Sequence, residues 1–338
     1  MNFPKYDIAI GNVTHTGKVR DHNEDYMAHF DTYLGYCIII CDGMGGHSAG
    51  EIASQNAIIS IQQYLQDSKN NIRDIPTALK NAIEFANYQL REMVNQNIQL
   101  KGMGTTCVLA LITNGKLYFA HAGDSRLYRI SGNDIEQLTK DHSVVQKMID
   151  SGILSEAEAE LSDKKNQISK AIGVFEKVEP SISDTAIVLM ENDKFLLCSD
   201  GLTAHINKEI IFETVSKIAD VQMAVLQLTD LAIEAGGSDN ITIQLIHYTG
   251  KPNKIKGKKV FSRRKKILAT TLFVSLLLIF IWAYRNLNIT DRKAQKVIKS
   301  NNGRDTINKN EELLKQTDTP ALHKKSTVPN KKYTLQKR

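Results

Sequence analysis

Residues 36–51 read YCIIICDGMGGHSAGE, and this stretch decides the fold around it. Its apolar run predicts a buried strand that ends at Asp42, and the pattern of an apolar helix begins near Ser48. The glycines between them let backbone carbonyls and amides approach closely, so the turn suits a hard cation with oxygen ligands. Asp-Gly is also the commonest signal of a tight turn, and this stretch alone leaves that simpler interpretation open.

Three further aspartates stand at the ends of predicted strands, beside small residues. Asp200 follows the apolar run 196–198, Asp239 precedes the apolar run 241–246, and Asp124 lies between glycine and serine. His and Cys do not accompany them at ligand spacing, and a set of carboxylates and carbonyls selects magnesium, manganese or calcium over zinc or copper. Two such ions that share a carboxylate can hold a hydroxide and bind a phosphoryl oxygen. If the aspartates converge, they predict a dinuclear metallohydrolase.

The composition indicates a globular domain followed by a basic appendage. The 338 residues are 42% hydrophobic, which is enough for a substantial core. Residues 1–250 carry 20 Lys and Arg against 32 Asp and Glu, whereas residues 251–338 carry 23 against 5. An acidic domain argues against a nucleic-acid partner, because contact with phosphodiesters needs a basic surface. The first residues lack the pattern of a secretory signal.

All four cysteines lie in apolar, strand-like runs, and none is spaced as CxxC. Buried free thiols in a reducing compartment are the simplest interpretation, so we expect neither a disulfide nor a zinc site. The four are Cys37, Cys41, Cys107 and Cys198.

The first half of the chain predicts strands and helices in separate blocks. Residues 6–15 alternate as a strand, a polar loop follows, and another strand covers 34–41. Helices are predicted after Ser48 and from Pro76, a residue that suits a first helical turn. From residue 102 the period changes to two, which predicts an antiparallel meander of three consecutive strands at 102–113, 115–123 and 125–132.

The second half predicts an insert and then a return to the core. Short helices are expected around 143–151 and 155–161, outside the core. Strands resume at 181–190 and 194–200, two helices fill 207–234, and a last strand ends near residue 248. Blocks of strands and blocks of helices with hairpin-like links favour an antiparallel α+β architecture over a doubly wound parallel sheet.

Eight sequence blocks, in this order, resemble the signature motifs of one enzyme family. They span roughly residues 8–248 and read RDHNED at 20–25, DGMGGHSAGE at 42–51, GTT at 104–106, HAGDSRLY at 121–128, LTKDHS at 138–143, SKAIG at 169–173, CSDGLT at 198–203 and GGSDNITI at 236–243. The chain thereby resembles bacterial members of the metal-dependent protein phosphatases, the type 2C serine/threonine phosphatase family. The resemblance implies a four-layer αββα sandwich of two antiparallel β-sheets flanked by helices. It also implies hydrolysis of phosphoserine and phosphothreonine in proteins with Mn²⁺ or Mg²⁺.

The resemblance assigns metal ligands position by position. Asp42 matches the carboxylate that bridges two ions, with the Gly43 carbonyl on one ion and Asp200 and Asp239 on the other. Asp124 matches the residue that, with Asp200, holds a third and weaker ion in bacterial members. Asp25 matches a further carboxylate of the family, which contacts an ion through a bound water.

The remaining roles concern the substrate and the support of the ligands. Arg20 matches the residue that forks onto the substrate phosphate, for which a planar guanidinium is well suited. His47 matches the histidine proposed to protonate the leaving alkoxide, and an imidazole with a pKa near neutral is chemically apt. Glu24 and Asn240 are expected to lie beside the ligands and support them. Other motif residues are expected to be structural: His121 and His142 as hydrogen-bonding residues, and Thr105 and Thr106 as strand residues. Lys170 departs from the family, which usually has arginine there.

The C-terminal part predicts a membrane anchor. Residues 251–266 contain nine basic and no acidic residues, and residues 267–284 are 18 uncharged, mostly apolar residues. As a helix the latter would be roughly 27 Å long, which is just enough to cross a hydrocarbon core. The cations before this span place the catalytic domain, residues 1–250, on the cytoplasmic side of the plasma (inner) membrane. The polar tail 285–338 is expected to be disordered or to fold on a partner.

The sequence therefore predicts a single-pass, membrane-anchored phosphatase. Its partners would be phosphoproteins, including a membrane serine/threonine kinase that it opposes, and no nucleic acid. The alternative is a catalytically weak membrane scaffold that binds phosphoproteins through a degenerate site. A phosphodiesterase or nuclease that uses the same ions is disfavoured by the acidic domain.

Overall fold

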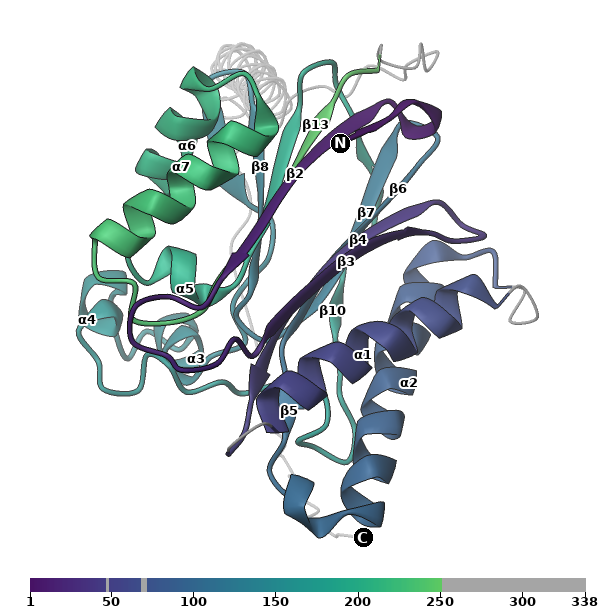
Figure 1. Ribbon diagram of the computed structural model, residues 1–338, viewed down its shortest axis with the longest axis vertical. Coiled ribbons are helices and arrows are strands. Elements are labelled where there is room, and N and C mark those ends of the chain that lie inside the picture. The colour runs from purple at the N-terminus through teal and green to yellow at the C-terminus, as the bar shows by residue number, and fades with distance from the viewer. Residues whose placement is uncertain (47–48, 68–71, 251–338) are drawn as a thin grey trace, which may run out of the picture. The chain divides into compact units, whose positions relative to one another are not determined.

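Two antiparallel β-sheets form the centre of the described chain, which comprises residues 1–46, 49–67 and 72–250 of a computed structural model (Figure 1). The first sheet has the strand order β1-β2-β13-β12-β8-β9. In that order its strands are Asn2–Phe3, Ile8–His15, Ile241–Tyr248, Lys194–Cys198, Arg126–Ser131 and Asp134–Gln137.

The second sheet has seven strands, five of them in the order β10-β7-β6-β4-β3. These are Ser181–Ile182, Lys116–Ala122, Cys107–Thr113, Tyr36–Met44 and Asp25–Asp31. Two short strands complete the sheet: β11 (Ile187–Val188) pairs with β7, and β5 (Gly104–Thr105) pairs with β4.

Helices cover the outer face of each sheet (Figure 1). The second sheet carries α1 (Ala49–Gln66) and α2 (Ile75–Gln96), and the first carries α6 (Lys208–Lys217) and α7 (Val221–Glu234). Helix α2 begins one residue before the predicted Pro76, where the Asp74 side chain accepts a hydrogen bond from the backbone N–H of Thr77 at 3.1 Å. The short elements are α3 (Val144–Asp150), α4 (Glu156–Glu160), α5 (Asp200–Thr203) and the 3₁₀ turns η1 (Pro4–Tyr6) and η3 (Ile98–Leu100).

Three hydrophobic clusters join these four layers. Successive β4 residues point to opposite faces, as a strand requires: Cys37, Ile39 and Cys41 pack with α1 and α2. Ile38 and Ile40 pack against the first sheet instead. A third cluster joins the outer face of the first sheet to α6 and α7. This architecture confirms the predicted α+β sandwich of two antiparallel sheets flanked by helices, and it explains why β4 reads as a continuous apolar run.

The predicted meander is wrong at its third strand. Strands β6 and β7 pair as expected, but β8 pairs with β12 and β9 in the other sheet. The period of two identifies strands and not their partners, so it missed the crossing between the sheets. Gly123 lies at this crossing with φ +112°, a conformation that favours glycine. Asp124 is thereby placed where the chain passes from one sheet to the other.

One prediction needs correction, and others concern residues outside the described chain. The predicted strand over 181–190 forms only two short strands, β10 and β11, of two residues each. In the described ranges no helix is long and apolar enough to span a membrane. The predicted linker, span and tail, together residues 251–338, lie outside the described residues, as does His47. All four cysteines are buried and free.

Candidate metal centre

The antiparallel strands bring the predicted ligands to one end of the sandwich. Asp25 begins β3 and stands directly opposite Asp42 near the end of β4. Asp200 follows the end of β12, and Asp239 precedes the start of β13, the strand that pairs with β12. Asp124 lies in the link that leaves the same end of β7. We call this end the carboxylate rim.

The aspartates of the carboxylate rim are close enough to disfavour each other's charge. Burial raises the pKa of Asp42 well above its usual value, and Asp25, Asp200, Asp124 and Asp239 raise this pKa further. Burial, opposed in part by hydrogen bonds and reinforced by Asp200, raises the pKa of Asp25 to about 7. Burial and then Asp200 raise the pKa of Asp124 to about 7. Asp200 follows the same trend, with its pKa raised by burial and then by Asp239.

Two oxygens of the carboxylate rim fit a hard cation. Asp25 Oδ1 and Asp124 Oδ1 are buried and accept no hydrogen bond from the described residues. Unpaired buried carboxylate oxygens are costly, and an oxygen-binding divalent ion would offset that cost. Among the described residues, no group of three or more His, Cys, Asp or Glu side chains is arranged so that it could hold a metal ion. In this structure Asp239 Oδ2 instead accepts a hydrogen bond from Arg20.

Arg20 and Asp239 form an ion pair at the carboxylate rim. Arg20 Nη2 lies 2.8 Å from Asp239 Oδ2, although the two residues are 219 positions apart in the sequence. The Arg20 side chain is 49% exposed, so its guanidinium remains accessible to a phosphate. The structure therefore places the predicted phosphate-binding residue beside a predicted metal ligand.

Close backbone packing explains why glycine follows Asp42. The N–H of Gly43 donates to the Glu24 carbonyl at 3.1 Å. A Cβ atom on Gly43 would lie 2.1 Å from the Gly50 carbonyl oxygen and 2.6 Å from that of Glu24. Burial raises the pKa of the Glu24 carboxyl group. Glu24 thus lies next to the predicted ligands, as expected.

The Asn240 side chain holds the loop between β2 and β3 in place by hydrogen bonds. This loop carries Arg20. Asn240 Oδ1 accepts from the N–H of Glu24 at 2.8 Å, and its Nδ2 donates to the carbonyls of Thr16 and His22 at 2.8 and 2.9 Å. Asn240 is 5% exposed, so these bonds are shielded from water. The sequence predicted support from this residue but not its reach across the β2–β3 loop.

Two hydroxyl residues beside the ligands were not predicted as part of the site. Ser199 Oγ donates to Asp25 Oδ2 at 2.7 Å and accepts from the N–H of Thr242 at 3.0 Å. Thr106 Oγ1 accepts from the N–H of Asp42 at 3.0 Å, and the Thr106 N–H donates to the Asp42 carbonyl at 2.8 Å. Both belong to motif blocks, GTT at 104–106 and CSDGLT at 198–203, and both lie directly beside a strand end, which was the signal that could have identified them.

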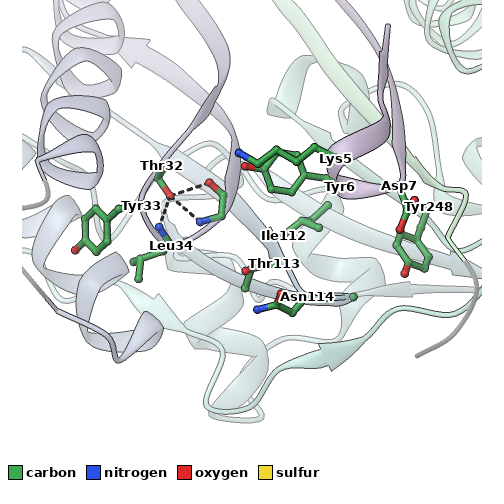
Figure 2. Close-up of a pocket in the computed structure, with 12 residues that line it drawn as sticks. Lys5, Tyr6, Asp7, Thr32, Tyr33, Leu34, Ile112, Thr113, Asn114 and Tyr248 are labelled. Atoms are coloured by element: carbon green, nitrogen blue, oxygen red, sulfur yellow. Dashed lines mark hydrogen bonds between the residues drawn. The ribbon is translucent and has the colours of Figure 1, made fainter. Parts of the chain in front are cut away.

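A cavity of about 410 Å³ lies at the opposite end of the same strands (Figure 2). It is lined by η1, by the turns after β3 and β6, and by Tyr248 near the end of β13. In Figure 2 the Thr32 hydroxyl bonds within the turn after β3, accepting from the N–H groups of Leu34 and Gly35. None of the predicted site residues lines this cavity, so it is separate from the carboxylate rim.

A sandwich with buried carboxylates converging at one rim defines a class of metal-dependent hydrolases. Comparison with known proteins identifies the family: the model of the family "Protein phosphatase 2C" matches residues 34–241. The chain belongs to the protein phosphatase 2C family, and the predicted enzyme class, a serine/threonine protein phosphatase, is confirmed.

Individual relatives agree with this assignment. Protein phosphatase PhpP of Streptococcus pneumoniae is 36% identical over 242 residues, which is 71% of this chain and 97% of PhpP. Serine/threonine protein phosphatase PstP of Mycobacterium tuberculosis is 35% identical over 228 residues, 67% of this chain and 42% of PstP.

Solved structures show the same fold. The serine/threonine phosphatase of S. agalactiae has a TM-score of 0.67 and 33% identity, over 72% of this chain and 100% of that one. The catalytic domain of PstP in complex with two manganese ions has a TM-score of 0.63 and 32% identity, over 72% of this chain and 99% of that one. The ions in the PstP structure belong to the class of cofactor that the sequence predicts.

Proposed function

We propose that residues 1–250 hydrolyse phosphoserine and phosphothreonine in proteins with the help of Mn²⁺ or Mg²⁺. The observation that carries this proposal is the meeting of Asp25, Asp42, Asp124 and Asp200 at one rim, where Asp25, Asp124 and Asp200 each raise the pKa of the buried Asp42. Membership of the protein phosphatase 2C family supports the same reaction.

The ligand set that we propose is the one that the resemblance to the family assigns to these residues. Asp42 would be shared between two ions, the Gly43 carbonyl would bind one, and Asp200 and Asp239 would bind the other. Asp124 would hold a third ion with Asp200, and Asp25 would act through a bound water. Such ions lower the pKa of bound water and neutralise charge on a phosphoryl group.

The protein's own groups would bind and orient the substrate. The Arg20 guanidinium is accessible and can fork onto two phosphate oxygens, a geometry that lysine cannot reproduce. Its partner Asp239 restricts where the guanidinium lies, and Asn240 holds the loop beneath it. When the phosphorus–oxygen bond breaks, the serine or threonine oxygen needs a proton, which His47 would donate.

An assay of a phosphothreonine peptide with the full chain tests the proposal. We expect turnover that requires Mn²⁺ and that Asp42→Ala or Asp239→Ala abolishes. Binding of the phosphopeptide without turnover would favour the non-catalytic scaffold instead. Turnover of bis(p-nitrophenyl) phosphate in preference to the monoester would favour a phosphodiesterase.

We propose further that residues 267–284 anchor the enzyme in the plasma (inner) membrane with its catalytic domain in the cytoplasm. The support is the span of 18 uncharged residues that follows nine cations in residues 251–266. In cells the full chain should sediment with membranes, and Leu276→Arg combined with Leu278→Arg should release it. A wild-type chain in the soluble fraction would contradict the anchor.

A membrane anchor would favour substrates on the same surface, because tethering raises the effective concentration of the enzyme near them. We propose a membrane serine/threonine kinase and its substrates as partners. Deletion of the phosphatase should then increase phosphorylation of membrane-associated kinases, measured by phosphoprotein profiling. Unchanged phosphorylation of those kinases would count against this partner.

A further inference from the structure

Two histidine rings stack beside the link that carries Asp124. His121 lies on β7, and His142 lies in the loop before α3. Their ring centroids are 4.4 Å apart and their planes differ by 10°. His121 is only 2% exposed, whereas His142 is half-buried. The reaction proposed above uses neither histidine.

Hydrogen bonds define which nitrogen of each ring carries the proton. His121 Nε2 lies 2.8 Å from the Lys140 carbonyl, which can only accept, so this nitrogen donates. His142 Nδ1 accepts from the N–H of Gly123 at 3.2 Å, so its Nε2 donates to Ser181 Oγ at 2.9 Å. Burial lowers the pKa of His142 to about 3, which is consistent with a neutral ring.

His142 holds Gly123 through both of the peptide groups that flank it. Its ring accepts from the Gly123 N–H, and its own backbone N–H donates to the Gly123 carbonyl at 3.0 Å. Gly123 has φ +112°, and a Cβ atom there would lie 2.7 Å from the Thr106 side chain. Asp124 is the next residue, so the two bonds of His142 fix the turn from which its carboxylate projects.

His142 also holds the segment 143–180, which leaves the sandwich and returns to it at β10. The returning Ser181 stands opposite His121 in the ladder between β10 and β7 and accepts the bond from His142 Nε2. Within the segment, the N–H of Ser169 donates to the His142 carbonyl at 2.6 Å. His142 therefore connects the Asp124 turn with Ser169 inside the segment and with Ser181, where β10 begins.

We propose that His142 is a positioning residue for Asp124, with Nδ1 fixing the turn that carries this carboxylate and Nε2 joining the turn to Ser181 at the start of β10. The inference rests on the proposed function, because the position of Asp124 matters to the reaction only if it holds an ion. His121 supports the ring of His142 by stacking and by its bond to Lys140.

Two substitutions separate the two ring nitrogens of His142. An Asn side chain can place its amide near the position of Nδ1, and a Gln side chain can place its amide near that of Nε2. His142→Asn should therefore keep the acceptor for Gly123 and lose the donor to Ser181. His142→Gln should do the reverse, and Ser181→Ala is the matched control, because it leaves the Gly123 contact untouched.

The measurements are Mn²⁺ binding by calorimetry, the melting temperature, and kcat and KM for a phosphothreonine peptide, all with the full chain. For His142→Gln we expect the weakest Mn²⁺ step to lose about tenfold in affinity, the usual effect of removing a group that orients a ligand, with KM for the peptide unchanged. His142→Asn and Ser181→Ala should bind Mn²⁺ as the wild type does. His121→Phe, which keeps an aromatic ring, should weaken the same step less than His142→Gln does.

The outcomes distinguish this inference from the proposed function. A wild-type chain that neither binds Mn²⁺ nor hydrolyses the peptide would overturn both. An active wild type whose His142→Gln variant binds Mn²⁺ normally would overturn only the positioning role. Equal losses of Mn²⁺ affinity in the Asn and Gln variants, following equal losses of melting temperature, would show a general structural role and would also overturn it. If His142→Gln does not fold, unaltered Mn²⁺ binding by a folded His121→Phe variant would have the same meaning.

Discussion

The two aspartates at the ends of β3 have opposite environments. Asp25, at the carboxylate rim, is 6% exposed, and burial raises its pKa to about 7. Asp31, at the other end, has a side chain that is 61% exposed and pairs with Lys5 at 2.9 Å. Hydrogen bonds from the Tyr6 hydroxyl and then from Lys5 lower the pKa of Asp31. The same strand therefore carries two different carboxylates: Asp25 resists ionisation, and Asp31 ionises more readily than usual.

This difference indicates which end of the sandwich carries the candidate site. Exposed pairs such as Lys5 and Asp31 contribute little to stability and need no further partner. At the carboxylate rim the folded chain holds several buried carboxylates near one another, which lowers stability unless a cation binds. The cavity at the Asp31 end would mislead a search based on volume (Figure 2). Incompletely paired, buried charge is the better indicator of the active end.

The largest expected effect comes from removing the shared carboxylate. Asp42→Asn should lower kcat/KM for a phosphothreonine peptide by about 10³-fold or more, because charge stabilisation by a bound ion is worth several kcal/mol. Asp31→Asn, at the other end of the sandwich, is the control and should stay within about twofold of the wild type. Comparable losses in both variants would remove the functional distinction between the two ends.

The pH dependence of stability sharpens the comparison. Asp25 has a folded pKa of about 7, above its ordinary value of 3.8, so between these values the folded state binds more protons than the unfolded state. The free energy of unfolding of residues 1–250, measured by urea with EDTA, should therefore fall as pH rises from 5 to 7.5. Asp25 alone should contribute on the order of 3 kcal/mol to this fall.

Two variants test the source of this pH dependence. Asp25→Asn should make the fall smaller without abolishing it, because it removes one titrating group while Asp124, whose pKa is also raised to about 7, remains. Asp31→Asn should leave the profile unchanged in this range, because the lowered pKa of Asp31 acts only at more acidic pH. A stability that rises with pH in the absence of metal would show that the rim carboxylates are not strained as described.

Substitution of Asn240 should have an effect of intermediate size on stability and on KM. Asn240→Ala removes three hydrogen bonds from the loop that carries Arg20, which should cost about 2 kcal/mol of stability and raise KM for the phosphopeptide. Asn207→Ala is the matched control, because Asn207 caps α6 away from the site. Stability should fall in both variants, whereas KM should rise only in Asn240→Ala.

Local patterns predicted the elements of this fold better than their pairing. The apolar run of β4 identified a buried strand, and Pro76 identified the start of α2 to within one residue. A period of two cannot say which sheet a strand joins, so the crossing at Gly123 was missed. That crossing depends on packing against Thr106, a contact between distant parts of the chain.

The sequence also predicted the residues of the candidate site better than the contacts between them. The strand-end aspartates indicated divalent ions from their chemistry alone, but their individual roles came from the resemblance of whole motifs to a family. The pair of Arg20 and Asp239 joins positions 219 residues apart, which no local pattern can indicate. Support by Ser199 was missed for the same reason, since its partner Asp25 lies 174 positions away.

The smallest expected effect concerns Ser199, whose hydroxyl donates to Asp25 Oδ2 at 2.7 Å. Ser199→Ala leaves both Asp25 oxygens without that donor, so the pKa of Asp25 should rise further and Mn²⁺ affinity should fall by about tenfold at most. Thr229→Val is the control, because the buried Thr229 hydroxyl bonds only to the Val225 carbonyl within α7. Calorimetry of Mn²⁺ binding should separate the two variants, even if both lose a similar amount of stability. Equal Mn²⁺ affinity in both would mean that Asp25 is oriented by its strand alone, and that the carboxylate rim depends on backbone geometry rather than on its hydroxyl partners.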